Sequence, residues 1–188
     1  MPSKVAFLDR DGTIIEEKDF IKTADQIEFV PGSIDAIKML RSLGYKIVVV
    51  SNQSGIGRGI LTEKMVTDVN ASFLRRLEEQ GAPADGLYFC PHHPYDNCDC
   101  RKPKTGMIQR AVRELKLDLR DAVVVGDKLA DIQLGKNIGA TTVLVLTGYG
   151  RKALDKLTDS NPDGEPDFVA ENLLGAASWL KNLGSRKS

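Results

Sequence analysis

The chain has 188 residues, of which 41% are hydrophobic and 28% are charged, a composition typical of one soluble globular domain and unlike that of a disordered chain. The 26 basic and 26 acidic side chains cancel to a net charge of zero, which argues against a general electrostatic grip on nucleic acid or on an anionic membrane. No apolar run is longer than a strand and no apolar signal segment precedes the first charged motif, so we expect no membrane span and a cytoplasmic location.

Short apolar runs alternate along the chain with segments of helical periodicity. A strand is predicted at 5–8, and apolar residues at 34, 37, 40 and 43 predict a helix over 33–43. The next predicted elements, in chain order, are a strand at 46–50, a helix at 62–80 with Thr62 as its N-cap, a strand at 86–90, a helix at 106–115, a strand at 122–125, a helix at 129–137, strands at 142–146 and 167–169, and a helix at 172–180. The polar segment 155–166 is predicted to be a surface loop.

This alternation predicts an α/β fold in a single domain spanning residues 1–188, with a parallel sheet covered by helices on both faces. In such sheets, ligands bind beyond the carboxyl ends of the strands. The segments that follow strands and carry polar side chains are 9–13, 51–59, 90–104 and 126–131. We therefore expect the functional residues in these four segments.

Two pairs of carboxylates follow predicted strands. Asp9 and Asp11 come after the first strand, and Gly12 allows the chain to turn sharply behind them. Asp127 and Asp131 follow the fourth strand at the i,i+4 spacing of a helix, so we expect them to share a face. Carboxylates brought together need a cation, and oxygen ligands favour Mg²⁺. Either pair alone would also fit the common structural use of Asp in turns and helix caps.

Three cysteines lie close together in the pattern Cys90-x-His92-x₅-Cys98-x-Cys100. Three thiolates and one imidazole complete a tetrahedral Zn²⁺ site with no open position, so the metal would be structural. We expect a zinc-binding loop at about 90–104, where few apolar side chains are present and a metal would stabilise the loop. The alternatives are three reduced cysteines beside a surface histidine, or His93 as the fourth ligand.

Four motifs occur in the same order as in the haloacid dehalogenase superfamily of phosphatases. The segment FLDRDGT at 7–13 resembles the nucleophile motif D-x-D-G-T, Ser51 the second motif, Lys102 the third, and Gly126-Asp127-x-x-x-Asp131 the fourth. Each motif alone is weak, but the ordered set is specific and covers essentially the whole chain. The resemblance implies a Rossmann-like three-layer fold with a parallel sheet. The segment 16–28 is too short for a large cap domain, so we expect none, with a flap at 25–29.

Two branches of this superfamily share further segments with the chain, one acting on a heptose bisphosphate and the other on histidinol phosphate. The segments NQSGIGRG at 52–59 and CPHHP at 90–94 look more like the heptose branch. The resemblance thus implies a Mg²⁺-dependent phosphatase that removes the 7-phosphate of D-glycero-D-manno-heptose 1,7-bisphosphate through an aspartyl-phosphate. Histidinol phosphate is the alternative substrate. A nucleic-acid 3′-phosphatase and an inactive binding protein are weaker alternatives, opposed by the zero net charge and by the intact Asp9 and Asp11 pair.

The resemblance also implies roles for the carboxylates. Asp9 would be the nucleophile, and Asp11 would be the general acid and then the general base. Mg²⁺ would lie between Asp9, the backbone carbonyl of Asp11, and Asp127. Asp131 would hold metal-bound water or orient Lys128 or Lys102, and Thr13 would lie behind these groups.

The side chains expected to contact the substrate are Ser51, Asn52, Arg58, Arg101, Lys102 and Lys128. Ser51 and Lys102 would bind the transferring phosphoryl group. Arg58, Arg101 and Lys128 are candidates for the second phosphate, although cations in loops are usually solvated.

The families that the chain resembles carry zinc in the cysteine loop, which favours His92 over His93 as its ligand. A zinc ion there would hold Arg101 and Lys102 over the active site. We expect a small sugar bisphosphate as the only partner, no nucleic acid or membrane, and a monomer as the default.

Overall fold

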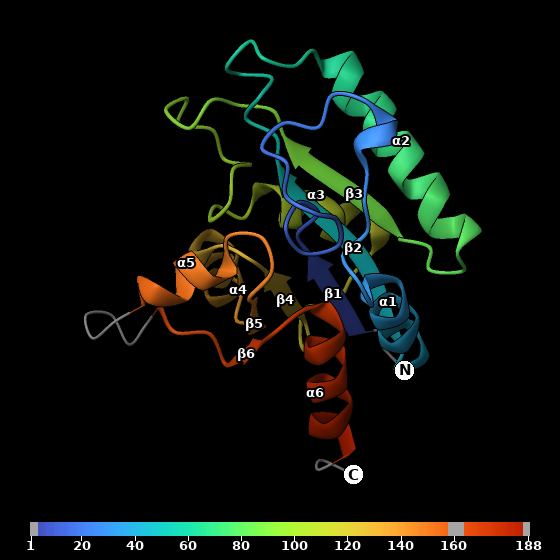
Figure 1. The fold of residues 1–188 in the computed structure, drawn as a ribbon. Helices are drawn as coiled ribbons and strands as arrows, with labels where there is room; N and C mark the ends of the chain where they lie inside the picture. The colour runs from blue at the N-terminus through green and yellow to red at the C-terminus, as the bar shows by residue number, and fades with distance from the viewer. Residues whose placement is uncertain (1–3, 158–163, 186–188) are drawn as a thin grey trace.

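A six-stranded, wholly parallel sheet forms the centre of the protein in this computed structural model, which describes residues 4–157 and 164–185 (Figure 1). The strands are β1 Lys4–Leu8, β2 Tyr45–Asn52, β3 Gly86–Cys90, β4 Val123–Gly126, β5 Thr141–Val145 and β6 Phe168–Ala170. They lie in the order β3-β2-β1-β4-β5-β6. The strand order therefore reverses between β1 and β4, which is where open α/β sheets bind ligands.

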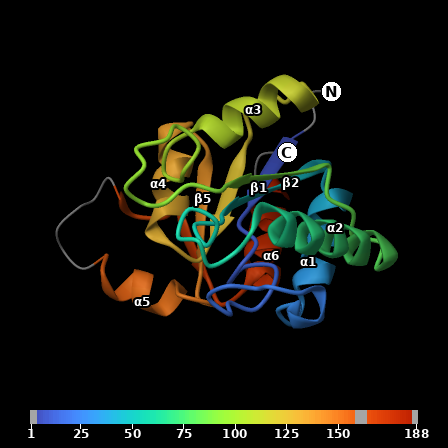
Figure 2. The same cartoon turned by 90° about the horizontal axis from the view of Figure 1, so that it is seen from above.

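Helices cover both faces of the sheet, as Figure 2 shows. They are α1 Ser33–Ser42, α2 Glu63–Glu79, α3 Gly106–Leu115, α4 Leu129–Asn137, α5 Gly150–Asp155 and α6 Leu173–Ser185, with a short 3₁₀ helix, η1, at Ala24–Gln26. Helices α1, α2 and α6 pack against one set of strand side chains, including Leu8 and Val125, and α3 and α4 pack against the alternate set, including Phe7 and Val124. Because successive strand residues enter different cores, the strands are apolar throughout.

The predicted α/β sheet and every predicted strand and helix are confirmed, with small shifts at their ends. The Thr62 hydroxyl caps α2 by accepting a hydrogen bond from the Met65 amide at 3.1 Å. Sequence periodicity missed η1 and α5, because elements this short do not complete a periodic pattern. Residues 158–163, in the middle of the predicted loop 155–166, lie outside the described residues.

The predicted flap at 25–29 was wrong, because this segment packs into the core. Ile27 is 2% exposed, and Phe29 pairs with the chain that follows β1. Arg76 of α2 also donates a hydrogen bond to the Ile27 carbonyl at 2.8 Å. The sequence of so short a segment does not reveal that its apolar side chains point inward.

The register of the central strands brings the residues after β1, β2 and β4 to one level. Leu8 pairs with Val49 and with Val125. The chain then turns at Gly12, with φ of +84°, where a Cβ atom would collide with the Asp127 carboxylate. Only glycine allows this conformation and this close approach, so Gly12 sets the β1 loop against the β4 loop.

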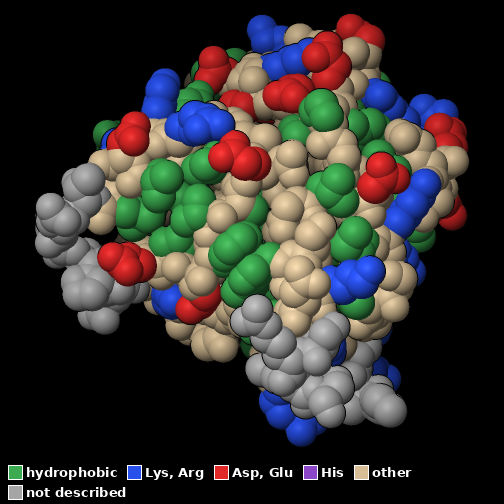
Figure 3. Space-filling view, turned by 60° about the horizontal axis from the view of Figure 1, so that its bottom comes forward, with side chains coloured by type: hydrophobic (Ala, Val, Ile, Leu, Met, Phe, Trp, Pro, Cys, Tyr) green, Lys and Arg blue, Asp and Glu red, His purple; other side chains and the backbone are tan. Residues whose placement is uncertain are grey.

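One face of the protein shows charges of both signs (Figure 3), in agreement with the balanced composition. Lys and Arg side chains are interspersed with Asp and Glu side chains on the face that Figure 3 shows, so this face is not a continuous basic surface. Among the residues that the structure describes, no helix combines the length and the apolar character needed to cross a membrane.

Candidate active site

A cavity of about 240 Å³ lies beyond the carboxyl ends of β1, β2 and β4, where the strand order reverses. The predicted residues that line it are Asp9, Asp11, Ser51, Asn52, Arg101, Lys102, Lys128 and Asp131. It is also lined by residues that the sequence did not single out, namely Glu17, Asp19, Phe20, Gln53, Ser54, Ala130 and Tyr149. Segments far apart in the sequence therefore build one site, as the strand order requires.

Lys102 is the centre of a buried network of charges. Its Nζ lies 2.8 Å from Asp9 Oδ1 and 2.6 Å from Asp131 Oδ1, and it donates a hydrogen bond to the Val50 carbonyl at 2.8 Å. Burial raises the pKa of Asp9, but the charges of Lys102 and Lys128 outweigh burial and hold this pKa below its usual range. Burial lowers the pKa of Lys102, but the two carboxylates raise it by more. Asp9 is thus kept as an anion and Lys102 as a cation.

Asp127 is fully buried and its carboxylate is only half satisfied. Oδ2 accepts a hydrogen bond from the Tyr149 amide at 2.8 Å, whereas Oδ1 accepts none from the described residues and lies 3.4 Å from Lys128 Nζ. Burial, and then the charge of Asp9, raise the pKa of Asp127 to about 8. Asp127 precedes α4 rather than lying on it, so the predicted helical spacing with Asp131 was wrong, although both side chains reach the same place.

The three buried carboxylates fit a hard cation. Oxygens of Asp9, Asp127 and Asp131 lie within 4.8 Å of one another. Lys102 offsets part of their charge, but Asp127 Oδ1 still has a lone pair without a donor. A cluster of carboxylate oxygens with an unused lone pair is the environment that Mg²⁺ prefers.

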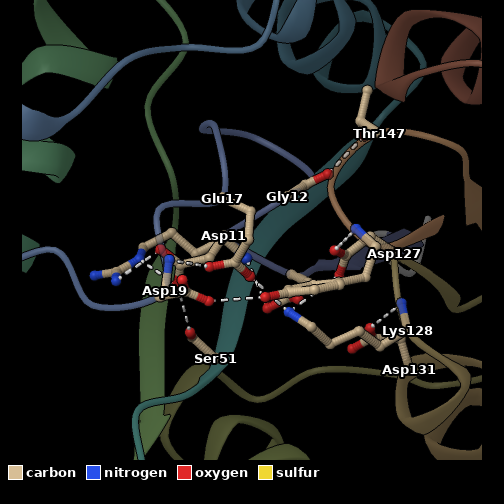
Figure 4. A network of polar contacts seen from close by, with 12 residues as sticks. Asp11, Gly12, Glu17, Asp19, Ser51, Asp127, Lys128, Asp131 and Thr147 are labelled. Carbon is tan, nitrogen blue, oxygen red and sulfur yellow. Dashed lines mark hydrogen bonds and ion pairs between the residues drawn. The ribbon is translucent and has the colours of Figure 1, made fainter. Parts of the chain in front are cut away.

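Asp11 lies beside Ser51 at the other side of the cavity (Figure 4). Its Oδ2 accepts hydrogen bonds from Gln53 Nε2 at 2.8 Å, from Ser51 Oγ at 3.3 Å and from Arg10 Nε at 3.1 Å. Its Oδ1 accepts one from Arg10 Nη2 at 3.0 Å. Arg10 and Gln53 belong to the sequence motifs, but no spacing rule indicated that they contact Asp11.

The remaining predicted residues differ in how closely they approach the cavity. Asn52 exchanges two side-chain hydrogen bonds with the backbone of Lys102, at 3.0 and 3.3 Å, and so fixes that loop. Arg101 lines the cavity, and its buried Nη1 has no hydrogen-bond partner among the described residues. Arg58 is exposed and does not line the cavity, so the structure does not bring it to the site. Thr13 is fully buried behind the cavity wall.

An acidic rim around Lys128 was not predicted. Lys128 Nζ pairs with Glu17 Oε2 at 2.9 Å and lies 4.9 Å from the centre of the Tyr149 ring. The Tyr149 hydroxyl donates a hydrogen bond to Asp19 Oδ1 at 2.8 Å. Burial raises the pKa of Glu17, although Lys128 opposes this. These partners are 111 and 130 positions apart in the chain, so no local pattern could have indicated them.

A second cluster of possible metal ligands consists of Cys90, His92, Cys98 and Cys100. Cys90 Sγ lies 3.6 Å from both His92 Nδ1 and Cys98 Sγ. Cys100 Sγ lies 3.2 Å from His92 Nδ1 and 3.6 Å from Cys98 Sγ. Zn–S bonds of about 2.3 Å would give tetrahedral edges of about 3.8 Å, close to these separations. The cluster therefore fits Zn²⁺.

The neighbouring histidine points elsewhere, and the thiols differ in acidity. His93 Nδ1 accepts a hydrogen bond from the Tyr95 amide at 3.3 Å and is not part of the cluster. Burial raises the pKa of Cys90 and of Cys100. Burial favours a higher pKa for Cys98 as well, but hydrogen bonds from the Arg101 amide and the other thiols outweigh burial and lower the pKa of Cys98.

Comparisons with known proteins agree with this geometry. The HAD-hydrolase-like family model matches residues 99–176. The chain is 38% identical to the D-glycero-beta-D-manno-heptose-1,7-bisphosphate 7-phosphatase of Haemophilus influenzae, over 96% of this chain and 98% of the relative. It is 41% identical to the protein of that name from Neisseria meningitidis serogroup B, over 94% of each.

Solved structures show the same likeness. The D,D-heptose 1,7-bisphosphate phosphatase from B. bronchiseptica, complexed with magnesium and phosphate, superposes with a TM-score of 0.85 and 35% identity, over 96% of this chain and 99% of that one. The D,D-heptose 1,7-bisphosphate phosphatase from Burkholderia thailandensis gives a TM-score of 0.70 and 31% identity, over 95% and 99%.

Proposed function

Because the chain belongs to the family of D-glycero-β-D-manno-heptose-1,7-bisphosphate 7-phosphatases, within the haloacid dehalogenase superfamily, we propose that it hydrolyses the 7-phosphate of that bisphosphate and releases the heptose 1-phosphate. The observation that carries this proposal is the meeting of Asp9, Asp127 and Asp131 with Lys102 at the strand reversal. The alignments extend over nearly the full length of the relatives, so the site and its surroundings are compared together.

The first half of the reaction is a transfer of the phosphoryl group to Asp9. A carboxylate oxygen of Asp9 attacks phosphorus, and the bond between phosphorus and the sugar C7 oxygen breaks. Asp11 gives its proton to the leaving oxygen. A water molecule then attacks phosphorus of the aspartyl-phosphate, Asp11 takes the proton of that water, and Asp9 and inorganic phosphate are released.

Residues around Asp9 would stabilise the transferring group. Mg²⁺, held by Asp9, the Asp11 carbonyl and Asp127, would screen the nucleophile from the negative phosphate. Ser51 and Lys102 would bind phosphoryl oxygens, and the Asp131 carboxylate keeps Lys102 in place at 2.6 Å. Thr13 would support the β1 loop from behind.

The rest of the cavity would bind the sugar and its second phosphate. Arg101 has a buried Nη1 without a protein partner, which suits a phosphate oxygen. Lys128 is held at the cavity by Glu17 at 2.9 Å and is the second candidate. Asn52 acts indirectly, through the backbone of Lys102. The cysteine cluster would hold Zn²⁺ and thereby fix the loop that carries Arg101 and Lys102.

We also propose that residues 1–188 act as a single domain and as a monomer, with a small sugar bisphosphate as substrate and no nucleic-acid partner. The three cysteines are free thiols, as zinc binding and a reducing cytoplasm would both require. The zero net charge of the chain supports a small-molecule substrate rather than nucleic acid.

The test is phosphate release with Mg²⁺ from the β and α anomers of D-glycero-D-manno-heptose 1,7-bisphosphate, from histidinol phosphate, and from a 3′-phosphorylated oligonucleotide. We expect kcat/KM for the β anomer to exceed that for the last two substrates at least about 100-fold. EDTA should stop the reaction and added Mg²⁺ should restore it. A preference for histidinol phosphate or the oligonucleotide, or activity that is indifferent to metal, would overturn the proposal.

A further inference from the structure

Arg10 stands between the two candidate catalytic carboxylates in the sequence, but its side chain is 2% exposed and turns away from the metal-ligating cluster toward α2. We infer that Arg10, held from behind by Asn70 of α2, is the positioning residue that sets the orientation of the Asp11 carboxylate. This inference rests on the proposed phosphatase function, and it assigns part of the catalytic geometry to residues outside the cavity lining.

The contact between Arg10 and Asp11 is a two-pronged fork. Nε donates to Asp11 Oδ2 at 3.1 Å, and Nη2 donates to Asp11 Oδ1 at 3.0 Å. A planar guanidinium that holds both carboxylate oxygens fixes rotation as well as position, which a single hydrogen bond does not. Without the fork, Gln53 and Ser51 would still hold Oδ2 of Asp11, but nothing among the described residues would hold Oδ1, so the fork fixes the position of Oδ1.

The fork is itself rigid because the rest of Arg10 is fixed. Nη1 donates to Oδ1 of Asn70, a residue that is 6% exposed on α2. The Arg10 amide donates to Asp9 Oδ1 at 2.8 Å, and the Arg10 carbonyl accepts hydrogen bonds from the Ile14 and Ile15 amides at 3.0 Å each. Asp11 is the only anion that pairs with Arg10 among the described residues. Because Arg10 has no other acidic partner there and is fixed at Nη1 and at its backbone amide, its guanidinium stays in place against Asp11.

The fork also distinguishes the two oxygens of Asp11. Oδ2 accepts from three donors, Arg10 Nε, Gln53 Nε2 and Ser51 Oγ. Oδ1 accepts only from Arg10 Nη2 among the described residues, so it keeps an open lone pair. We assign the transferred proton to Oδ1. This proton passes from Oδ1 to the C7 oxygen as the phosphorus–oxygen bond breaks, and water returns a proton to Oδ1 in the second half.

The chemistry of the leaving group separates positioning from structure. A sugar alkoxide leaves poorly and needs the Asp11 proton, whereas p-nitrophenolate leaves without one. Because kcat/KM reports only the steps through transfer to Asp9, it isolates the step in which Asp11 acts as acid. Misplacing Asp11 should therefore lower kcat/KM for the heptose bisphosphate much more than for p-nitrophenyl phosphate.

The experiment measures kcat/KM on both substrates for the wild type, Arg10→Met, Arg10→Lys and Asn70→Leu. For Arg10→Met we expect a loss of about 100-fold on the heptose bisphosphate and a much smaller loss on p-nitrophenyl phosphate. Arg10→Lys restores the charge without the fork and should recover part of this loss. Asn70→Leu removes the hydrogen bond to Arg10 Nη1 and leaves the fork itself in place. It should also lower kcat/KM more for the heptose bisphosphate than for p-nitrophenyl phosphate, but by a smaller factor than Arg10→Met.

Arg76→Met is the matched control. Like Asn70, Arg76 lies on α2; it donates a hydrogen bond to the Ile27 carbonyl at 2.8 Å and does not touch Asp11. Arg76→Met should therefore change kcat/KM by the same factor for both substrates. Equal losses on both substrates in Arg10→Met, or an unchanged ratio in Asn70→Leu if Arg10→Met does not fold, would overturn the inference. A wild type that hydrolyses neither substrate would instead overturn the proposed function.

Discussion

The two clusters of possible metal ligands in this chain are built in opposite ways. Asp9, Asp127 and Asp131 are all buried, and other elements supply the partners that hold them. In the cysteine cluster only Cys90 lies on a strand and is buried, while His92 is exposed. The fold thus forms the carboxylate cluster, whereas a metal ion bound by the cysteine cluster would help to order the loop around it.

Hydrogen bonds near both ends of the loop 90–104 hold it to the rest of the protein. The Cys90 carbonyl accepts a hydrogen bond from the Gln53 amide at 2.8 Å, and the Pro103 carbonyl accepts one from Asn137 Nδ2 at 2.9 Å. Between these ends, Tyr95 is 90% exposed. A loop of this kind buries too little apolar surface to order itself, and a tetrahedral metal would supply the missing cross-link. Loss of chemistry and loss of loop order should therefore be separable by mutation.

The largest effect should come from the carboxylate cluster, with chemistry lost and the fold retained. Asp9→Asn removes the proposed nucleophile, so turnover should fall by as much as about 10⁶-fold. Lys102 keeps its ion pair with Asp131, so the melting temperature should change little. Phosphate release and thermal unfolding measure the two effects. The control is Asp68→Asn, because this side chain is exposed on α2 and the variant should behave as wild type. Substantial turnover by Asp9→Asn would show that Asp9 is not the nucleophile.

The fold could be predicted from the sequence because its strands and helices carry local signals. Strands such as Val123–Gly126 are apolar throughout because both faces are covered, and α2 begins at a side-chain cap on Thr62. The sequence did not predict which way the side chains of short segments point. Ile27 and Phe29 contact the core because of α2, a helix that begins more than thirty positions later, and nothing local in their own segment indicates it.

The second prediction tests the cysteine cluster. Cys98→Ala should lose bound zinc and lower kcat/KM by roughly 100-fold, because Arg101 and Lys102 follow directly in the loop and small displacements there are costly. Elemental analysis and kinetics on the same preparation check both effects. His93→Ala is the matched control. Because His93 lies outside the cluster, this variant should retain zinc and activity. Wild-type protein without zinc, or full activity in Cys98→Ala, would contradict the assignment.

The site was predictable only where motif spacing carries chemistry. Asp9, Asp11 and Lys102 follow strands, and the sheet brings strand ends together whatever the intervening sequence. Glu17 and Tyr149 were missed because their contacts join distant loops, and charge alone does not distinguish a cavity residue from a solvated one. Arg58 illustrates the opposite error, since it shares a motif-like segment with Gln53 yet remains exposed.

The smallest expected effect comes from Arg101 and Arg58, two arginines that the sequence predicts as candidates for binding the second phosphate. Arg101 has a buried Nη1 without a protein partner, so a charge-assisted bond to the second phosphate would be worth about 1.5–3 kcal/mol. Arg101→Met should therefore raise KM for the heptose bisphosphate by about 10–100-fold, with a smaller effect on a monophosphate that lacks the second group. Arg58→Met, an exposed substitution, should stay within about twofold of wild type. Equal KM values for the two variants would mean that the buried Arg101 guanidinium does not bind the second phosphate. The zinc loop would then contribute to catalysis through Lys102 alone.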